Sequence, residues 1–186
     1  MKKIVIIGPE STGKSTLCSQ LAAHYRTHWV QEYARRYLLE NGTHYSFDDL
    51  LLIAKGQLSV EDQGADSLSA PPSSPAATEP ILFIDTNMYV MKVWCEVVFD
   101  NCHRYILDQI VRRMYDLYLL CDTDLAWVKD ELREYPDLPV RRKLFHMYHD
   151  ILINQYTPWV LISGTYEERL QGGIRAVDSL FQTKMP

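Results

Sequence analysis

The apolar residues of this chain fall into two patterns that alternate along the sequence. One is a short continuous apolar run, which is typical of a strand buried on both faces of a parallel sheet. Such runs predict strands at residues 3–7, 27–30, 81–84, 116–120 and 159–162. The other is a repeat of apolar residues at intervals of three and four, which predicts helices. Helices are expected from about residue 14, at 32–40, after the capping residue Ser46, at 87–99, 105–114 and 140–155, and after the turn at 163–165.

Strands that alternate with helices predict an α/β doubly wound fold, in which helices flank a parallel sheet of five buried strands. Ligands of such folds bind at the carboxyl ends of the strands. The segments that follow the first, third, fourth and fifth strands should therefore converge on one site. The pair Gly172-Gly173 weakens the prediction for the middle of the last helix.

The turn between the first strand and the first helix carries the pattern G-x-x-x-x-G-K-[ST], the phosphate-binding P-loop. Its residues are Gly8, Pro9, Glu10, Ser11, Thr12, Gly13, Lys14 and Ser15, and Thr16 follows as a further nucleotide-binding candidate. Successive N–H groups of such a loop and the helix N-terminus attract a phosphate. We expect Lys14 to reach the phosphates of ATP and Ser15 to bind Mg²⁺. A chance glycine turn is the alternative, but the strand before the motif and the helix after it favour the P-loop.

Asp85 ends the third predicted strand, where P-loop proteins place a second acidic residue. Its carboxylate is a candidate for holding Mg²⁺, or for accepting a proton from a substrate hydroxyl. The residue type fits both roles equally. Helix capping by Asp85-Thr86-Asn87 is the alternative explanation for an acidic residue at this position.

Glu32, Arg35 and Arg36 open the helix that follows the second strand. A carboxylate at this edge of the sheet can bind ribose hydroxyls, and an arginine can bind phosphate through its planar fork. A solvated helix face with a Glu–Arg pair accounts for the same residues.

The polar stretch at 122–142 is too long for a plain connection, and we expect it to form a lid. Arg133 is the first choice for an arginine that stabilises the transferring phosphoryl group, and Arg141 or Arg142 is the second. Ordinary surface charge is the alternative for all three residues.

Two further features come from the last third of the chain. Gly164 and Thr165 are expected to line an adenine pocket through backbone groups, although a plain strand-to-helix turn predicts the same residues. His146 and His149 share a helix face without an evident third ligand, so no metal site is expected there.

Composition narrows the class of protein. The length of 186 residues suits a single domain, and a stretch at 63–80 that is rich in proline, serine and alanine predicts a flexible surface loop within it. The net charge of −5 argues against broad nucleic-acid binding and leaves a local basic groove as the alternative. No apolar run is long enough to span a membrane, and the first strand begins at once, which leaves no room for a signal peptide. The four cysteines lack C-x-x-C spacing, so we expect a cytoplasmic protein with reduced thiols.

Four blocks of this sequence resemble the ribosylnicotinamide kinase domain of the NadR proteins, over nearly the full length of the chain. The blocks are residues 8–15, Glu32-Tyr33-Ala34-Arg35, Phe83-Ile84-Asp85-Thr86, and 116–120 followed by 127–133. The resemblance implies an enzyme of NAD biosynthesis that moves the γ-phosphate of ATP onto the ribose 5′-hydroxyl of nicotinamide riboside, giving nicotinamide mononucleotide. It also implies that Asp85 faces that hydroxyl and that Glu32 and Arg35 belong to the substrate pocket.

The chain departs from the NadR pattern in two respects. NadR proteins carry an adenylyltransferase domain before the kinase, whereas this chain starts at the P-loop strand, so adenylyltransferase activity is expected to be absent. The family also holds the nicotinamide ring between aromatic side chains, and at those places this chain has Gln31 and, farther on, Asp62. Trp29 and Trp127 are the candidates for the aromatic role.

The leading hypothesis is therefore an ATP- and Mg²⁺-dependent kinase of a small nucleoside-like alcohol, with Lys14, Asp85 and Arg133 as catalytic residues. A kinase of another nucleoside, such as a deoxynucleoside, is one alternative. A non-catalytic ATP-binding module, whose lid reports bound nucleotide to a partner, is the other. The sequence pattern carries no indication of an oligomeric state.

Overall fold

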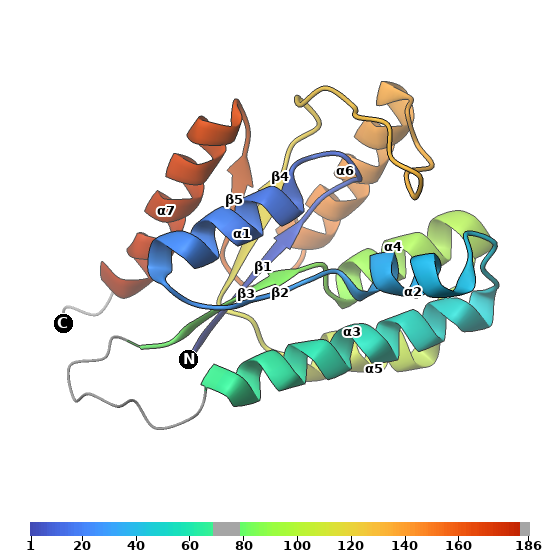
Figure 1. Ribbon diagram of the computed structural model, residues 1–186, viewed down its shortest axis with the longest axis horizontal. Coiled ribbons are helices and arrows are strands. Elements are labelled where there is room, and N and C mark those ends of the chain that lie inside the picture. Colours follow the sequence, from blue (N-terminus) through green and yellow to red (C-terminus); the bar gives the residue numbers. More distant parts are fainter. Residues whose placement is uncertain (69–78, 183–186) are drawn as a thin grey trace.

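The computed structural model describes residues 1–68 and 79–182 (Figure 1). In chain order its elements are β1 (Lys2–Ile7), α1 (Lys14–Tyr25), β2 (Trp29–Val30), α2 (Tyr33–Asn41), α3 (Phe47–Leu68), β3 (Ile81–Asp85), α4 (Met88–Phe99), α5 (Arg104–Arg112), β4 (Leu117–Cys121), α6 (Leu138–Ile153), β5 (Trp159–Ile162) and α7 (Tyr166–Gln182).

The five strands form one parallel sheet in the order β2-β3-β1-β4-β5. The central strand β1 pairs with β3 through Ile6 opposite Asp85, and with β4 through Ile7 opposite Leu120. The predicted α/β fold with a parallel sheet is therefore confirmed. Because all strands run the same way, their carboxyl ends meet at one edge of the sheet.

Alternate side chains of the strands enter two separate cores. Ile4 and Ile6 of β1 pack with residues of α1 and α7 on one face of the sheet. Val5 and Ile7 pack with residues of α4 and α6 on the other face. A third core joins α2, α3, α4 and α5, which lie together at one side of the sheet (Figure 1). This helical layer forms one wall of the site described below.

The ends of several helices differ from those predicted from the sequence. The stretch at 63–80 is not a loop throughout, because α3 continues to Leu68. Ala65 and Leu68 pack against the core that contains Val5 and Ile7. Tertiary packing therefore overrides the weak local preference of this stretch for a helix. The remaining expectation, a flexible loop, concerns mainly residues 69–78, which lie outside the described residues.

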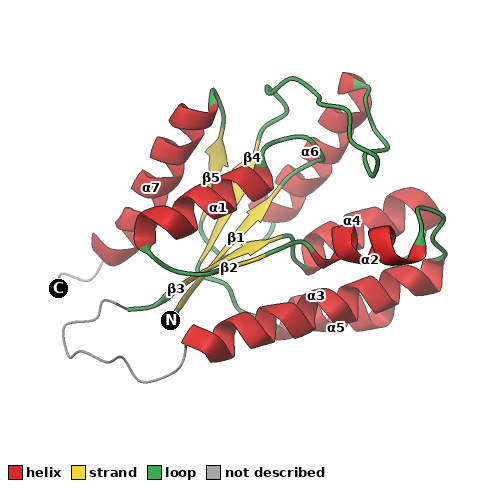
Figure 2. Cartoon of the chain, in the orientation of Figure 1, coloured by secondary structure: helices red, strands yellow, loops and turns green. Residues whose placement is uncertain are grey.

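The connection between β4 and α6 is shorter than predicted (Figure 2). It ends at Asp137, because α6 begins at Leu138, and Pro139 sits in the first turn, where proline is tolerated. Arg141 and Arg142 are therefore helical residues. The connecting segment, residues 122–137, is called the lid segment below.

The predicted last helix is confirmed, whereas the expectation that the last strand is buried needs correction. The last helix is continuous through its glycine pair, and Gly173 allows close approach to α1, because a Cβ there would lie 3.2 Å from the Leu21 side chain. Strand β5 is at the sheet edge and is not fully buried, since Val160 and Leu161 are exposed. Within the described residues, no helix has the length and apolar character needed to cross a membrane.

Candidate active site

The P-loop joins β1 to α1 and folds as its glycines predict. Gly8 has a φ of +143°, and a Cβ there would lie 2.7 Å from the carbonyl oxygen of Cys121, so only glycine fits. Gly13, at a φ of +78°, directly precedes α1. Thr12 closes the loop by donating from its hydroxyl to the carbonyl oxygen of Pro9 at 2.7 Å, and the Lys14 ammonium donates to the same carbonyl at 2.9 Å. The Lys14 charge is thus held against the loop that it is expected to serve.

Asp85 is fully buried at the carboxyl end of β3, beside the P-loop. Its Oδ2 accepts a hydrogen bond of 2.5 Å from the Ser15 hydroxyl. Burial and, to a smaller extent, the nearby Glu32 charge raise the pKa of the Asp85 carboxyl to about 7, although Lys14 and the Ser15 hydroxyl act in the opposite direction. A carboxyl with a pKa near neutrality can hold or release a proton under ordinary conditions.

Helix capping does not account for Asp85. The cap of α4 is Asn87, whose side chain accepts a hydrogen bond from the backbone N–H of Tyr89 at 3.1 Å. Thr86 lies between Asp85 and Asn87, and its φ of +76° is strained for a β-branched residue. Such strain clusters at functional sites, and here it lies in the corner that aims Asp85 at the P-loop.

The residues at this point fit a magnesium ion. Asp85 Oδ1 is buried and has no hydrogen-bond partner among the described residues, and the Ser15 hydroxyl adds a second oxygen ligand nearby. Mg²⁺ prefers oxygen ligands, and typically takes one or two from protein and the rest from phosphates and water. Within the described part of the chain there is no group of three or more histidine, cysteine or acidic side chains that could hold a metal by itself.

A cavity of about 280 Å³ opens from the P-loop toward the third core. Its far wall is apolar and aromatic, and is built from α2, α4, α6 and the lid segment. The wall residues are Ala34, Leu38, Val90, Val93, Trp94, Val97, Leu132, Tyr135, Leu144 and Tyr148. The cavity lining therefore combines a phosphate-binding loop with an apolar surface that suits a ring.

Sequence reasoning missed this wall. Trp94 is its largest member, and its indole N–H donates to the Tyr45 hydroxyl at 2.8 Å, while that hydroxyl donates to Glu134 of the lid segment at 3.1 Å. The spacing of Val90, Val93, Trp94 and Val97 on one helix was the available signal, but such a stripe is usually read as core. Trp29, a sequence candidate for the aromatic role, packs in the core on the α1 side of the sheet.

Glu32 and Arg35 both line the cavity from the start of α2. Glu32 occupies the N-cap position without a side-chain capping bond, so its carboxylate faces the site rather than its own helix. Arg35 forms an ion pair with Asp130 of the lid segment at 3.0 Å, and this hydrogen-bonded partner raises the pKa of the guanidinium. Arg36 instead pairs with Glu40 on the exposed helix face, which agrees with the alternative of a solvated helix face with a Glu–Arg pair.

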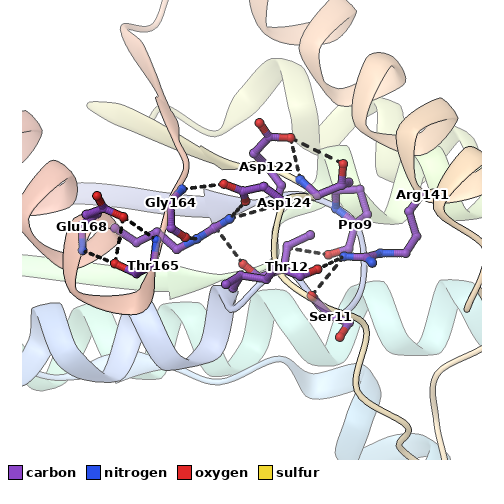
Figure 3. Close-up of polar contacts among 12 residues, drawn as sticks. Pro9, Ser11, Thr12, Asp122, Asp124, Arg141, Gly164, Thr165 and Glu168 are labelled. Atoms are coloured by element: carbon purple, nitrogen blue, oxygen red, sulfur yellow. Dashed lines mark hydrogen bonds and ion pairs between the residues drawn. The ribbon is translucent and has the colours of Figure 1, made fainter.

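The lid segment lies over the P-loop. Arg133 lines the cavity and donates to the carbonyl oxygen of Val128. Arg141 is buried and donates to the carbonyl oxygen of Ser11 (Figure 3). It also donates to the carbonyl oxygen of Leu125, and burial lowers the pKa of its guanidinium. Arg142 does not line the cavity and lies in a separate depression lined by residues of α6. Trp127 is not among the residues that line the cavity, and its indole N–H donates to Glu10 at 3.3 Å.

Arg169 of α7 joins the P-loop to the turn after β5, a role that its sequence position did not suggest. Its guanidinium is 2 % exposed and donates to the carbonyl oxygens of Gly164 at 2.8 Å and Thr12 at 3.0 Å. It also contacts Asp124, which accepts from the Gly164 N–H at 2.5 Å (Figure 3). Thr165 and Glu168 form a reciprocal capping pair at the start of α7. Gly164 is thus placed beside the P-loop, although it does not line the cavity.

A P-loop next to a buried acidic residue on the neighbouring strand of a five-stranded parallel sheet defines a P-loop nucleotide-binding protein. The chain belongs to the AAA domain family, whose model matches residues 3–169.

Relatives of known sequence include the trifunctional NAD biosynthesis/regulator protein NadR of Escherichia coli, at 25 % identity over 82 % of this chain and 36 % of the relative. NadR of Salmonella typhimurium is 28 % identical over 78 % of this chain and 34 % of the relative. These matches confirm the resemblance to NadR proteins. The chain spans about a third of the length of these relatives.

Solved structures with this fold include a NadR protein in complex with NAD and AMP-PNP, with a TM-score of 0.69, 22 % identity and coverage of 100 % of this chain and 51 % of the other. A NadR protein in complex with NR has a TM-score of 0.65 at 21 % identity, covering 100 % and 52 %. A deoxyadenosine kinase from M. mycoides has a TM-score of 0.62 at 13 % identity, covering 95 % and 99 %. The fold is therefore that of P-loop kinases of the nucleoside type.

Proposed function

We propose that this protein is an ATP-dependent kinase that phosphorylates the 5′-hydroxyl of a nucleoside-like small molecule, with nicotinamide riboside as the first acceptor to test. The observation that carries this proposal is the buried Asp85 carboxyl, which does not itself line the cavity but is bonded to Ser15, a P-loop residue that does. The matches to NadR proteins and the NadR complexes with AMP-PNP and NR support the choice of acceptor.

In this proposal the chain's own residues position two substrates. The backbone N–H groups of the P-loop and Lys14 hold the triphosphate, and the apolar wall around Trp94 holds the ring of the acceptor. Glu32 binds ribose hydroxyls, and Asp85 orients the 5′-hydroxyl and accepts its proton. A bound Mg²⁺, held by Ser15 together with phosphate oxygens and water, would neutralise phosphate charge, and Asp85 is its ligand only in the alternative in which Asp85 does not accept the proton.

Arg133 is the lid arginine best placed to stabilise the transferring group in this proposal, because it lines the cavity. Arg141 is already engaged with two backbone carbonyls and is buried beneath the lid segment. The exclusion of water by the lid segment keeps ATP from being hydrolysed without an acceptor.

A coupled ADP-release assay tests the proposed function. Purified protein with ATP and Mg²⁺ is given nicotinamide riboside, the common nucleosides and the deoxynucleosides one at a time. Stimulation of ADP release by nicotinamide riboside, with formation of its mononucleotide, is the expected result. Stimulation by a different nucleoside would keep the kinase and change the acceptor. Tight ATP binding without stimulation by any acceptor would overturn the kinase in favour of an ATP-binding module.

A further inference from the structure

Glu10, a variable position of the P-loop motif, holds the lid segment. Its carboxylate accepts hydrogen bonds from the backbone N–H groups of Tyr135 at 2.5 Å and Glu134 at 2.9 Å, and from the Trp127 indole N–H at 3.3 Å. Three donors from two separate stretches of the lid segment thus converge on a single side chain. Hydrogen bonds to a carboxylate are stronger than those between neutral groups, and two consecutive backbone N–H groups form a fixed anion-binding pair.

The next residue of the motif makes a second set of contacts to the same segment. The hydroxyl of Ser11 accepts from the backbone N–H of Val128 at 3.0 Å, and its carbonyl oxygen accepts from Arg141 at 3.2 Å. Arg141 also donates to Leu125 at the start of the lid segment. Ser11 has a φ of +56°, a conformation rarely adopted outside glycine, asparagine and aspartate. The loop is therefore strained at the point where it meets the lid segment.

We propose that Glu10 is a positioning residue that seats the lid segment on the P-loop. By holding the backbone at residues 134 and 135, it sets Tyr135 and the neighbouring Arg133 against the cavity that they line. The consequence for catalysis rests on the proposed kinase function: a lid segment freed from Glu10 admits water, so that ATP is hydrolysed without an acceptor. The seating itself does not depend on that function.

Amide hydrogen exchange, measured by NMR on the full chain without ligands, tests the seating. In the parent protein, the amides of Glu134 and Tyr135 should be protected. In Glu10→Ala their exchange should rise about tenfold or more, because each loses a charge-assisted hydrogen bond. Glu131→Ala is the matched control: it removes an exposed carboxylate of the same segment that makes no hydrogen bond to the P-loop within the described residues, and it should leave both amides protected.

A second variant keeps the test decisive if Glu10→Ala does not fold. Glu10→Gln preserves the size of the side chain but offers one acceptor oxygen and places an NH₂ group against a donor, so exchange should rise at one of the two amides. Unprotected amides in the parent protein, or unchanged protection in whichever variant folds, would overturn the seating role.

The catalytic consequence has its own measurement. Glu10→Ala should lower kcat for phosphoryl transfer with little change in the KM for ATP, because the P-loop N–H groups and Lys14 remain, and acceptor-independent ATP hydrolysis should rise several-fold relative to transfer. An unchanged ratio of hydrolysis to transfer would overturn the coupling role. A parent protein that transfers phosphate to no acceptor would reject the proposed function, while the exchange result would still decide the seating.

Discussion

The Ser15 hydroxyl donates a 2.5 Å hydrogen bond to Asp85, which joins the last residue of the P-loop motif to the last residue of β3. The sheet makes this contact possible, because β1 and β3 are neighbours and Asp85 stands opposite Ile6, just before the P-loop begins. A carboxyl that is fully buried in this position has lost its hydration, and that loss raises its pKa. The same bond therefore connects the phosphate site to the group expected to act on the acceptor.

Replacement of Asp85 by asparagine should separate ATP binding from phosphoryl transfer. The asparagine amide keeps the shape of the side chain but cannot accept a proton, so transfer to the acceptor should fall by about 10²–10⁴-fold. ATP affinity should change little, because the P-loop backbone and Lys14 are untouched. Titration calorimetry with ATP and the coupled ADP-release assay measure the two effects, and full transfer activity in Asp85→Asn would remove Asp85 from the mechanism.

The raised pKa of Asp85 predicts how activity depends on pH. Because the ionised carboxylate is the active form, kcat/KM should rise as the pH increases through about 7 and should level off above it. The profile is measured with initial rates from pH 5.5 to 8.5 at saturating Mg²⁺. A value of kcat/KM that stays constant from pH 6 to 8 would contradict an essential carboxylate with this pKa.

The same residue should make the protein less stable as the pH rises. The Asp85 carboxyl has a pKa of about 7 in the folded protein against an ordinary value of 3.8, so between these values the folded state holds a proton that the unfolded chain has released. The free energy of unfolding should therefore fall as the pH increases from about 4 to about 7. Melting curves of the parent protein and of Asp85→Asn check this, since the variant should show a smaller decline over this window.

The sequence could predict those parts of the site whose residues belong to a short continuous sequence pattern. The P-loop is a continuous motif, and Asp85 directly follows an apolar run, so both could be placed at the carboxyl edge of a parallel sheet. The apolar wall could not be predicted, because Trp94 looks like a core residue until Tyr45 and Glu134, far away in sequence, are brought against it. The prediction began the loop at residue 63, inside α3, because the composition there is typical of a loop. The last turn of α3 is stabilised by packing against the core, which composition does not reveal.

Trp94 should contribute to the acceptor site and not to the ATP site. Trp94→Leu removes most of the flat surface of the wall, so the KM for the acceptor should rise about tenfold while the KM for ATP stays within about twofold. Trp94→Phe keeps an aromatic face and is the matched control, with a smaller expected change. Steady-state kinetics with each substrate varied in turn measure both values, and equal increases in the two KM values would indicate a general loss of structure instead.

Arg169 should be needed for the stability of the whole nucleotide-binding edge. Its nearly buried guanidinium donates to Thr12, Asp122 and Gly164 and contacts Asp124, so Arg169→Met would leave three carbonyl oxygens and a carboxylate without this partner. A buried hydrogen-bonding group left without its partner costs about 1–3 kcal/mol, so loss of the contacts to the three carbonyl oxygens should lower Tm by roughly 10 °C for a protein of this size. Asp124 is 37 % exposed, so its ion pair adds little to this cost.

Arg175→Met, an exposed arginine on the same helix, is the matched control for Arg169→Met and should leave the melting temperature nearly unchanged. Arg169→Lys separates charge from geometry: it keeps the positive charge beside Asp124, but one ammonium cannot reach carbonyl groups on three separate segments. If the fork geometry matters, the lysine variant should melt well below the parent protein and should bind ATP more weakly, because the backbone of Thr12 is released. A lysine variant as stable as the parent would show that Arg169 acts through its charge alone.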